Sequence, residues 1–212
     1  MGKRVYGQYC GFARALELVG ERWALMIVRD LLVSPKRFSE LQRGLPGIPS
    51  NVLAARLKEM EAAGIVERRL ALRSSRILYE LTGTGAALEP AVTELGRWGA
   101  KLLGPPGEGE VLTLDALVTA LRSTFQAKAA KGVTVSYELR VGTMVVNARI
   151  ARGRLAVRAA PLPEADLAIE VGPTLRDLLA GELSPRKALS AGLVKIRGNR
   201  ALLDRFVELF RI

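Results

Sequence analysis

The chain has 212 residues, enough for one large domain or two ordinary ones, and 49% of them are hydrophobic, which excludes an intrinsically disordered chain. Its 32 Lys and Arg against 21 Asp and Glu give a net charge of +11, which suits a DNA partner, although ordinary soluble basic proteins share such an excess. With no histidine, and with Cys10 as its one cysteine, the chain lacks the usual general base, the commonest metal ligand and any intramolecular disulfide.

These absences argue against several classes of protein. Without side chains that exchange protons near neutral pH we expect no enzyme, and we expect neither a cofactor nor a metal. The single cysteine favours a reducing cytosol, and residues 1–10 are polar and basic with no apolar run behind them, unlike a secretory signal. The longest apolar run, Trp23–Val28, is far shorter than the ~20 residues that span a membrane. We therefore expect a cytoplasmic protein with no membrane partner.

The first residues of the chain are predicted to be helical. Phe12, Leu16 and Val19 recur at helical spacing, which predicts a first amphipathic helix. Residues 23–32 are apolar almost all round, which predicts a buried central helix that ends at Pro35.

Between residues 37 and 81 the pattern indicates a helix, a turn, a second helix and a hairpin. The helices are predicted over 38–43 and 49–63, and the strands over 66–72 and 77–81, joined by a basic tip at 73–76. This order of elements is typical of a winged helix-turn-helix, which binds DNA. One more helix, ending near Leu103, is predicted from an apolar stripe of Leu88, Val92, Leu95 and Leu102.

The helix over 49–63 has two faces when its residues are placed at 100° intervals. Its core face holds Leu53, Leu57 and Met60. Its outward face holds small and polar side chains, namely Ser50, Asn51, Ala54, Ala55 and Lys58. Asn51 can pair with adenine in the major groove, with a discrimination of ~1–3 kcal/mol, and Lys58 suits a phosphate or a guanine. Arg56 lies on the flank, where a phosphate contact and an internal salt bridge are equal alternatives.

Basic residues before and after this helix complete the predicted DNA interface. Lys36 and Arg37 open the preceding helix and Arg43 ends it, where backbone phosphates are expected. The tip formed by Arg73, Ser74, Ser75 and Arg76 suits a narrow minor groove. The alternatives are a solvated helix face and an ordinary exposed turn.

Several segments of the first half together form a specific pattern: Cys10, 15–23, 37–41, 53–66 and 79–85. Through them residues 10–103 resemble the HxlR family of prokaryotic winged-helix regulators, relatives of the MarR type. The resemblance implies a homodimer on a pseudo-palindromic double-stranded DNA operator, with the first and last helices of the domain as the dimer interface. Pro49 departs from the family, which often has a Ser or Thr helix cap there, and the wing lacks the usual proline.

Cys10 matches a cysteine that some HxlR members use as a redox or electrophile sensor. The alternative is a small buried apolar residue. Lys3 and Arg4 are close enough in sequence to lower the pKa of the thiol if they are also close in space.

A change of pattern separates the two halves of the chain. Residues 104–110 hold two prolines, three glycines and no apolar residue, so we predict a linker between a domain at 1–103 and a domain at 111–212. One amphipathic helix is predicted over 114–125, and after it apolar residues recur at every second position, as in a half-buried strand. Strands are predicted over 133–141, 143–151, 154–159, 166–171 and 193–197. Helices are also predicted, one with Ser184 as its cap and Pro185 just inside it, and a last one over 200–210 with Asn199 as its cap. The fold class is therefore α+β.

The second domain resembles the sterol carrier protein type 2-like fold through 165–169, 174–180, 183–189, 191–199 and 202–210. This resemblance implies a hydrophobic tunnel for a lipid or another apolar molecule, and we expect Met144, Val146, Phe206 and Phe210 to line it. The alternative for the apolar surplus is simply a good core. The charged strand residues Asp166, Glu170, Lys195 and Arg197 are interpreted as a solvated sheet face.

The leading hypothesis is a dimeric, sequence-specific transcription factor, a repressor, whose second domain senses an apolar small molecule. One alternative is a DNA-binding protein whose second domain is only structural. Another is an apolar-ligand carrier that has lost DNA binding, against which the basic tip and the small outward face argue.

Overall fold

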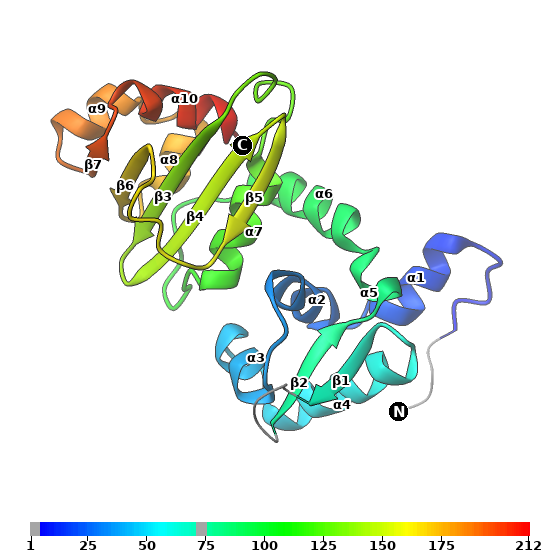
Figure 1. Ribbon diagram of the computed structural model, residues 1–212. Helices are drawn as coiled ribbons and strands as arrows, with labels where there is room; N and C mark the ends of the chain where they lie inside the picture. Colours follow the sequence, from blue (N-terminus) through cyan, green and yellow to red (C-terminus); the bar gives the residue numbers. More distant parts are fainter. Residues whose placement is uncertain (1–4, 71–75) are drawn as a thin grey trace. The chain divides into compact units, whose positions relative to one another are not determined.

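The computed structural model describes residues 5–70 and 76–212, which form two compact units, Met1–Val92 and Thr93–Ile212 (Figure 1). The division falls upstream of the predicted linker at 104–110, inside helix α6 (Glu89–Ala100). The predicted domain bounds, 1–103 and 111–212, stay a prediction.

The first unit is helical with one hairpin, in the order predicted for a winged helix-turn-helix. Before α6 its elements are α1 (Gly11–Val19), α2 (Ala24–Val33), α3 (Phe38–Gly44), α4 (Ser50–Ala62), β1 (Val66–Leu70), β2 (Ile77–Leu81) and α5 (Gly83–Ala86). Helix α2 is central because its apolar residues point in several directions. The core combines α2, α3, α4 and the start of β1, with side chains of Ile27, Val28, Leu41, Leu45, Leu53, Leu57, Met60, Ile65 and Val66.

A third strand segment completes the wing, and the sequence pattern did not predict it. β1 and β2 pair antiparallel, with Arg68 opposite Tyr79. On the other side of β2, Lys36 forms an isolated bridge with Tyr79: the Lys36 N–H donates to the Tyr79 carbonyl at 2.9 Å, and the Tyr79 N–H donates to the Lys36 carbonyl at 2.7 Å. These two bonds attach the segment before α3 to the hairpin, which fixes how α3 follows α2.

Three predicted helix boundaries are wrong by one to three residues. The central helix starts at Ala24, because Trp23 adopts a left-handed conformation (φ 79°) and stands at the N-cap. Pro49 is also an N-cap, in extended conformation, so that α4 starts at Ser50 instead of 49. Proline suits either position because no helical N–H bond is required there. The helix predicted to end near Leu103 ends at Ala100.

The second unit is a five-stranded sheet with helices. Its strands are β3 (Val135–Val141), β4 (Met144–Ala151), β5 (Arg154–Arg158), β6 (Leu167–Val171) and β7 (Val194–Gly198), in the spatial order β5-β4-β3-β6-β7. Only β3 and β6 are parallel neighbours. Helices α7 (Leu114–Thr124), α8 (Leu175–Ala180) and α10 (Ala201–Leu209) lie on one face of the sheet, and α9 (Pro185–Ser190) lies near β7 (Figure 1).

The predicted period of two is confirmed in β3, and it separates an inner from an outer face. Val135, Tyr137, Leu139 and Val141 are buried toward the helices. The Tyr137 ring packs edge-on against Phe206, with ring centroids 5.2 Å apart, and its hydroxyl donates to the Leu202 carbonyl at 3.3 Å. Burial raises the pKa of the Tyr137 phenol, so this hydroxyl stays protonated as a donor.

A buried carboxylate on the outer face fixes the connection from β5 to β6. Glu138 is 0% exposed; its Oε2 accepts the Leu162 N–H at 2.6 Å and its Oε1 accepts Arg140 Nε at 2.8 Å. Burial alone would raise the pKa of Glu138, but the Leu162 N–H and the Arg140 guanidinium together outweigh it and hold that pKa below its usual value. Asn147 lies opposite Glu138 in the neighbouring strand, and its Nδ2 donates to the Ala160 carbonyl at 2.8 Å. The connection from β5 to β6 therefore crosses the outer face of the sheet over Glu138 and Asn147.

The predicted helix caps of the second unit are confirmed, with one shift. The Ser184 hydroxyl accepts the Lys187 N–H at 3.4 Å, and Pro185 occupies the first turn of α9. Asn199 Oδ1 accepts the Ala201 N–H at 3.0 Å, although α10 starts at Ala201 instead of the predicted Arg200.

Candidate nucleic-acid interface

Helix α4 presents the outward face that the sequence predicts. Leu53, Leu57 and Met60 are buried in the core of the first unit. On the opposite side every predicted contact residue is exposed: Ser50, Asn51, Ala54, Ala55 and Lys58. The small alanines allow a groove wall to approach, while the amide and the ammonium supply donors.

Arg56 takes the second of its two predicted alternatives, the internal salt bridge. Its guanidinium pairs with Glu59 on the same helix and lies 3.5 Å from Glu21 Oε2, and its side chain is only 14% exposed. This group therefore ties α4 to the segment between α1 and α2. These ion pairs support the internal salt bridge, and the phosphate contact of Arg56 stays a prediction.

The basic residues around α3 have different surroundings. The Arg37 N–H donates to Glu40 Oε2 at 2.7 Å and caps α3, while its side chain is half-buried. Arg43 is exposed, and its Nε reaches the Ser39 carbonyl at 3.3 Å. The Lys36 backbone belongs to the wing sheet, and its ammonium lies 3.4 Å from the Ser34 hydroxyl. All three remain predicted phosphate contacts.

The wing tip is described only in part. Arg76 is exposed just before β2. Arg73, Ser74 and Ser75 lie outside the described residues, so their predicted minor-groove role stays a prediction. Sequence reasoning passed over two further basic residues on β1, Arg68 and Arg69, which are exposed but pair at 2.8 Å with Glu61 and Glu80.

Comparison with known proteins places this half of the chain in a family. The family of HxlR-like helix-turn-helix proteins matches residues 18–106. The regulator YvaP of Bacillus subtilis, described as an uncharacterized HTH-type transcriptional regulator, is 38% identical over 95 residues, covering 44% of this chain and 88% of YvaP. The chain belongs to the HxlR-like helix-turn-helix family.

Other relatives match the same half. The HTH-type transcriptional regulator YodB of Bacillus subtilis is 37% identical over 92 residues, covering 43% of this chain and 82% of YodB. The crystal structure of quinone-bound YodB is also similar, with 37% identity, a TM-score of 0.38, and coverage of 42% of this chain and 96% of that chain. The family match and the sequence identity to YvaP and YodB confirm the predicted HxlR resemblance of the first half, and the sterol-carrier resemblance of the second half stays a prediction.

The cysteine of this HxlR-like chain is exposed, so the alternative of a small buried apolar residue is wrong. Cys10 stands at the N-cap of α1. The backbone N–H groups of Ala13 and Phe12, at the start of α1, lower the pKa of the Cys10 thiol and favour its thiolate. Lys3 and Arg4 lie outside the described residues, so their predicted effect is untested. The sensor role stays a prediction.

The two helices that the HxlR resemblance assigns to a dimer both carry exposed apolar side chains. Around α1, Phe12 of the predicted apolar stripe is 72% exposed, and Tyr6 and Tyr9 are also exposed. On α6, Leu95 and Trp98 are exposed, whereas Val92, which belongs to the same predicted apolar stripe as Leu95, is buried.

The exposed side of α6 is opposite to the side that packs within the second unit. Gly96 lies so close to α7 that a Cβ atom there would stand 2.4 Å from the Ser123 hydroxyl oxygen, and Arg97 Nε donates to the Ser123 carbonyl at 2.9 Å. Trp98, two residues after Gly96 on the same helix, is 65% exposed. The helix therefore keeps an apolar face available after its contact with α7 is made.

The residues predicted to line an apolar tunnel lie in the core of the second unit. Met144 is half-buried, and Val146, Phe206 and Phe210 are buried. The rings of Phe206 and Phe210 are 4.8 Å apart by their centroids, so they pack directly on each other. This supports the alternative of a good core for the two phenylalanines, and a ligand site at these four residues stays a prediction.

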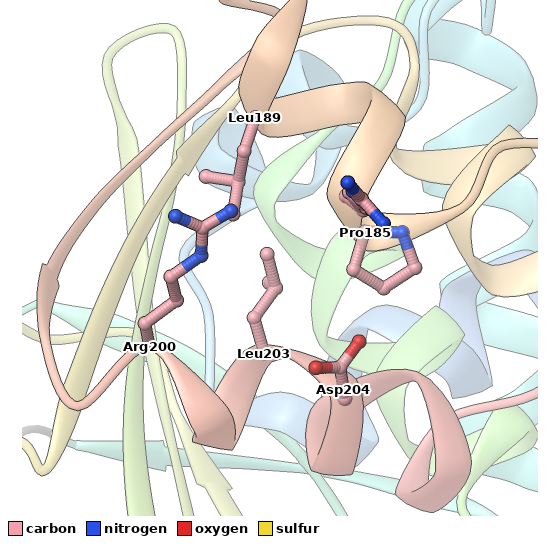
Figure 2. Close-up of a pocket in the computed structure, with 6 residues that line it drawn as sticks. Pro185, Leu189, Arg200, Leu203 and Asp204 are labelled. Carbon is pink, nitrogen blue, oxygen red and sulfur yellow. The ribbon is translucent and has the colours of Figure 1, made fainter.

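A shallow pocket lies elsewhere in the second unit, between α9 and α10 (Figure 2). It has a volume of about 170 Å³, with apolar and charged side chains around it: Pro185, Arg186, Leu189, Arg200, Leu203 and Asp204. Sequence reasoning missed this site because its residues come from two short helices, with no motif that joins them.

The described part of the chain gives no sign of a metal centre or a membrane span. No group of three or more His, Cys, Asp or Glu side chains in residues 5–70 and 76–212 could hold a metal ion. Within the same residues, no helix has the length and apolar character needed to cross a bilayer.

Proposed function

We propose that this HxlR-like protein is a sequence-specific, dimeric transcriptional regulator, a repressor, that inserts α4 into the major groove of its operator. The observation that carries this proposal is the exposed face of α4. On this face, exposed Asn51 would read a base edge, Ala54 and Ala55 would leave room for the groove, and Lys58 would supply a positive charge. The related YvaP and YodB are named as HTH-type transcriptional regulators.

The homodimer is supported by the exposed apolar side chains of two helices. Phe12 on α1 and Trp98 on α6 would lose contact with water in a symmetric contact between copies. A dimer would place two copies of α4 on the two halves of a pseudo-palindromic operator.

The second unit would act as the sensor of an apolar small molecule. Such a ligand changes DNA affinity only if it binds the DNA-competent and incompetent dimers differently, and typical coupling is ~1–3 kcal/mol. The pocket between α9 and α10 has Leu189 and Leu203 beside its charged groups, which supports a ligand with an apolar part. The close packing of Phe206 on Phe210 supports a second candidate, in which this unit is only structural.

The test is the affinity of the full chain for the DNA upstream of its own gene against scrambled DNA of equal length, across a salt series. A preference of ~10³ or more with a steep salt dependence supports a specific regulator. Equal weak binding to both DNAs contradicts it. Repeating the titration with a panel of apolar ligands separates the sensor from the structural role, since a purely structural second unit leaves the operator affinity unchanged.

A further inference from the structure

The second unit carries a concentration of arginine that DNA binding through α4 does not use. Between Glu138 and Glu164 the sequence holds five arginines and no acidic residue. Four of them form the arginine hairpin of β4 and β5: Arg149, Arg152, Arg154 and Arg158. Arg152 and Gly153 form its two-residue turn, both with positive φ (52° and 74°), which gives the tight connection between the strands.

Strand register places three of these arginines on the outer face of the sheet. Ala148 lies opposite Tyr137, which faces the helices, so its neighbour Arg149 faces outward. In the next strand pair, Arg158 lies opposite Asn147 and Arg154 lies opposite Ala151, on that same outer face. All of these arginines are exposed. The α7, α8 and α10 helices lie behind the sheet, on its other face (Figure 1).

Acidic residues near this face neutralise it only in part. Glu138 is buried beneath the β5–β6 connection, so it offers no carboxylate to an approaching polyanion. Arg149 pairs with Glu164 at 3.8 Å, but the two side chains are 61% and 75% exposed, and such pairs contribute little and exchange readily. Among the described residues, Arg154 and Arg158 have no ion-pair partner.

A second group of basic residues lies at the other edge of the sheet, beyond the β5–β6 connection that crosses the middle of the outer face. Arg197 occupies the same cross-strand row as Arg158, separated by three strands. At ~4.8 Å per strand spacing this row is roughly 19 Å wide. Next to Arg197 lies Lys195, which is 3.7 Å from Glu170. Charges spread over this width suit an extended polyanion better than one small anion. The exposed carboxylates of Glu170, Glu164 and Asp166 reduce the charge without cancelling it.

The side chains that lie between the arginines favour double-stranded DNA over single-stranded nucleic acid as the partner. The outward positions between them are small, including Ser136, Ala151 and Ala156, and no outward strand position of β3 to β7 is aromatic. Single-stranded nucleic acid is held by stacking of bases on aromatic side chains, whereas duplex phosphates require cations and close approach. We propose that the outer face of the arginine hairpin is a second DNA-binding surface, which contacts duplex phosphates without reading sequence.

A triple variant of the full chain, Arg149→Gln/Arg154→Gln/Arg158→Gln, tests the proposal. Fluorescence anisotropy with a random duplex gives the slope of log K against log salt. Losing three phosphate contacts should reduce the magnitude of that slope by about 2.7. Affinity for an operator and for random DNA should fall by the same factor, since the surface reads no sequence. Failure of the operator proposal would appear instead as equal wild-type affinities for both DNAs.

The control variant Lys128→Gln/Lys131→Gln/Arg211→Gln removes the same charge from three other exposed positions of the second unit. It should leave the slope within about one unit of the wild-type value. The charge-conserving variant Arg149→Lys/Arg154→Lys/Arg158→Lys should retain the wild-type slope, which separates charge from folding. Equal slopes for the Gln variant and the wild type would overturn the proposal. If that Gln variant also self-associates, the arginines protect the β5 edge from pairing with another strand.

Discussion

Replacing Glu138 by alanine should destabilise the second unit by about 1–3 kcal/mol. The substitution removes the acceptor of the Leu162 N–H, whose hydrogen bond is buried and 2.6 Å long, and an unsatisfied buried donor costs about that much. Arg140 adds little to the loss, because its side chain is 46% exposed and can turn to water. Glu138→Gln should cost less, since an amide oxygen can still accept the Leu162 N–H.

Hydrogen exchange of the β3, β4 and β6 amides measures this effect in the second unit alone, whatever the first unit does. The matched control is Glu170→Ala on the same outer face, where an exposed carboxylate lies 3.7 Å from Lys195 and the expected change is within about 0.5 kcal/mol. Equal protection in Glu138→Ala and Glu170→Ala would refute the assignment of Glu138 as the anchor of the β5–β6 connection.

The same carboxylate predicts a dependence on pH. Because the pKa of Glu138 is lower in the folded chain than its usual value, its ionised form contributes stability above the unfolded pKa of about 4.3. That contribution is lost as the pH falls through the folded pKa. The stability difference between wild type and Glu138→Ala should therefore be constant from about pH 5 to 8 and shrink below about pH 4. A stability difference between wild type and Glu138→Ala that grows as the pH falls would contradict the predicted direction of the pH dependence.

Three further predictions follow from single residues. Leu57→Ala should destabilise the first unit by about 2–5 kcal/mol in urea unfolding, because Leu57 is 2% exposed, whereas Lys58→Ala should change stability by less than about 0.5 kcal/mol. Native Cys10 should react with iodoacetamide with a pH midpoint below the ~8.5 of a free thiol, and a midpoint at or above it would count against the lowered pKa. Trp98→Ala should shift a dimer toward monomer in sedimentation, and an unchanged dimer would move the interface elsewhere.

Much of the fold could be predicted because the periodicity of apolar residues is a local property. The alternation in β3 and the helical stripe of Leu53, Leu57 and Met60 reflect burial of one face each, so both are visible in the sequence. The ends of helices are less visible. Trp23 and Pro49 take cap positions according to backbone geometry that the side-chain pattern does not encode.

The candidate site could be predicted only where a single helix defines it. The outward face of α4 depends on one helix, so its residues were found. Arg56 pairs with Glu59 on its own helix and also with Glu21, 35 positions earlier, and only tertiary structure brings Arg56 and Glu21 together. The exposure of Cys10 and Phe12 likewise depends on tertiary structure, because it is set by which other segments of the chain pack on α1. In the second unit, Phe206 and Phe210 were predicted to line a cavity, but they pack on each other. Composition could not predict this, because a cavity lining and a filled core consist of the same apolar residues.

The central claim is that α4 reads DNA sequence, and the most direct measurement compares Asn51→Ala with Lys58→Ala on an operator and on scrambled DNA. Asn51→Ala should reduce the ratio of the two affinities by about 5- to 150-fold, the equivalent of ~1–3 kcal/mol of base discrimination. Lys58→Ala, if its ammonium contacts a phosphate, should weaken binding to both DNAs equally and reduce the salt slope by about one. An unchanged ratio in Asn51→Ala would contradict the assignment of this face as the one that reads sequence.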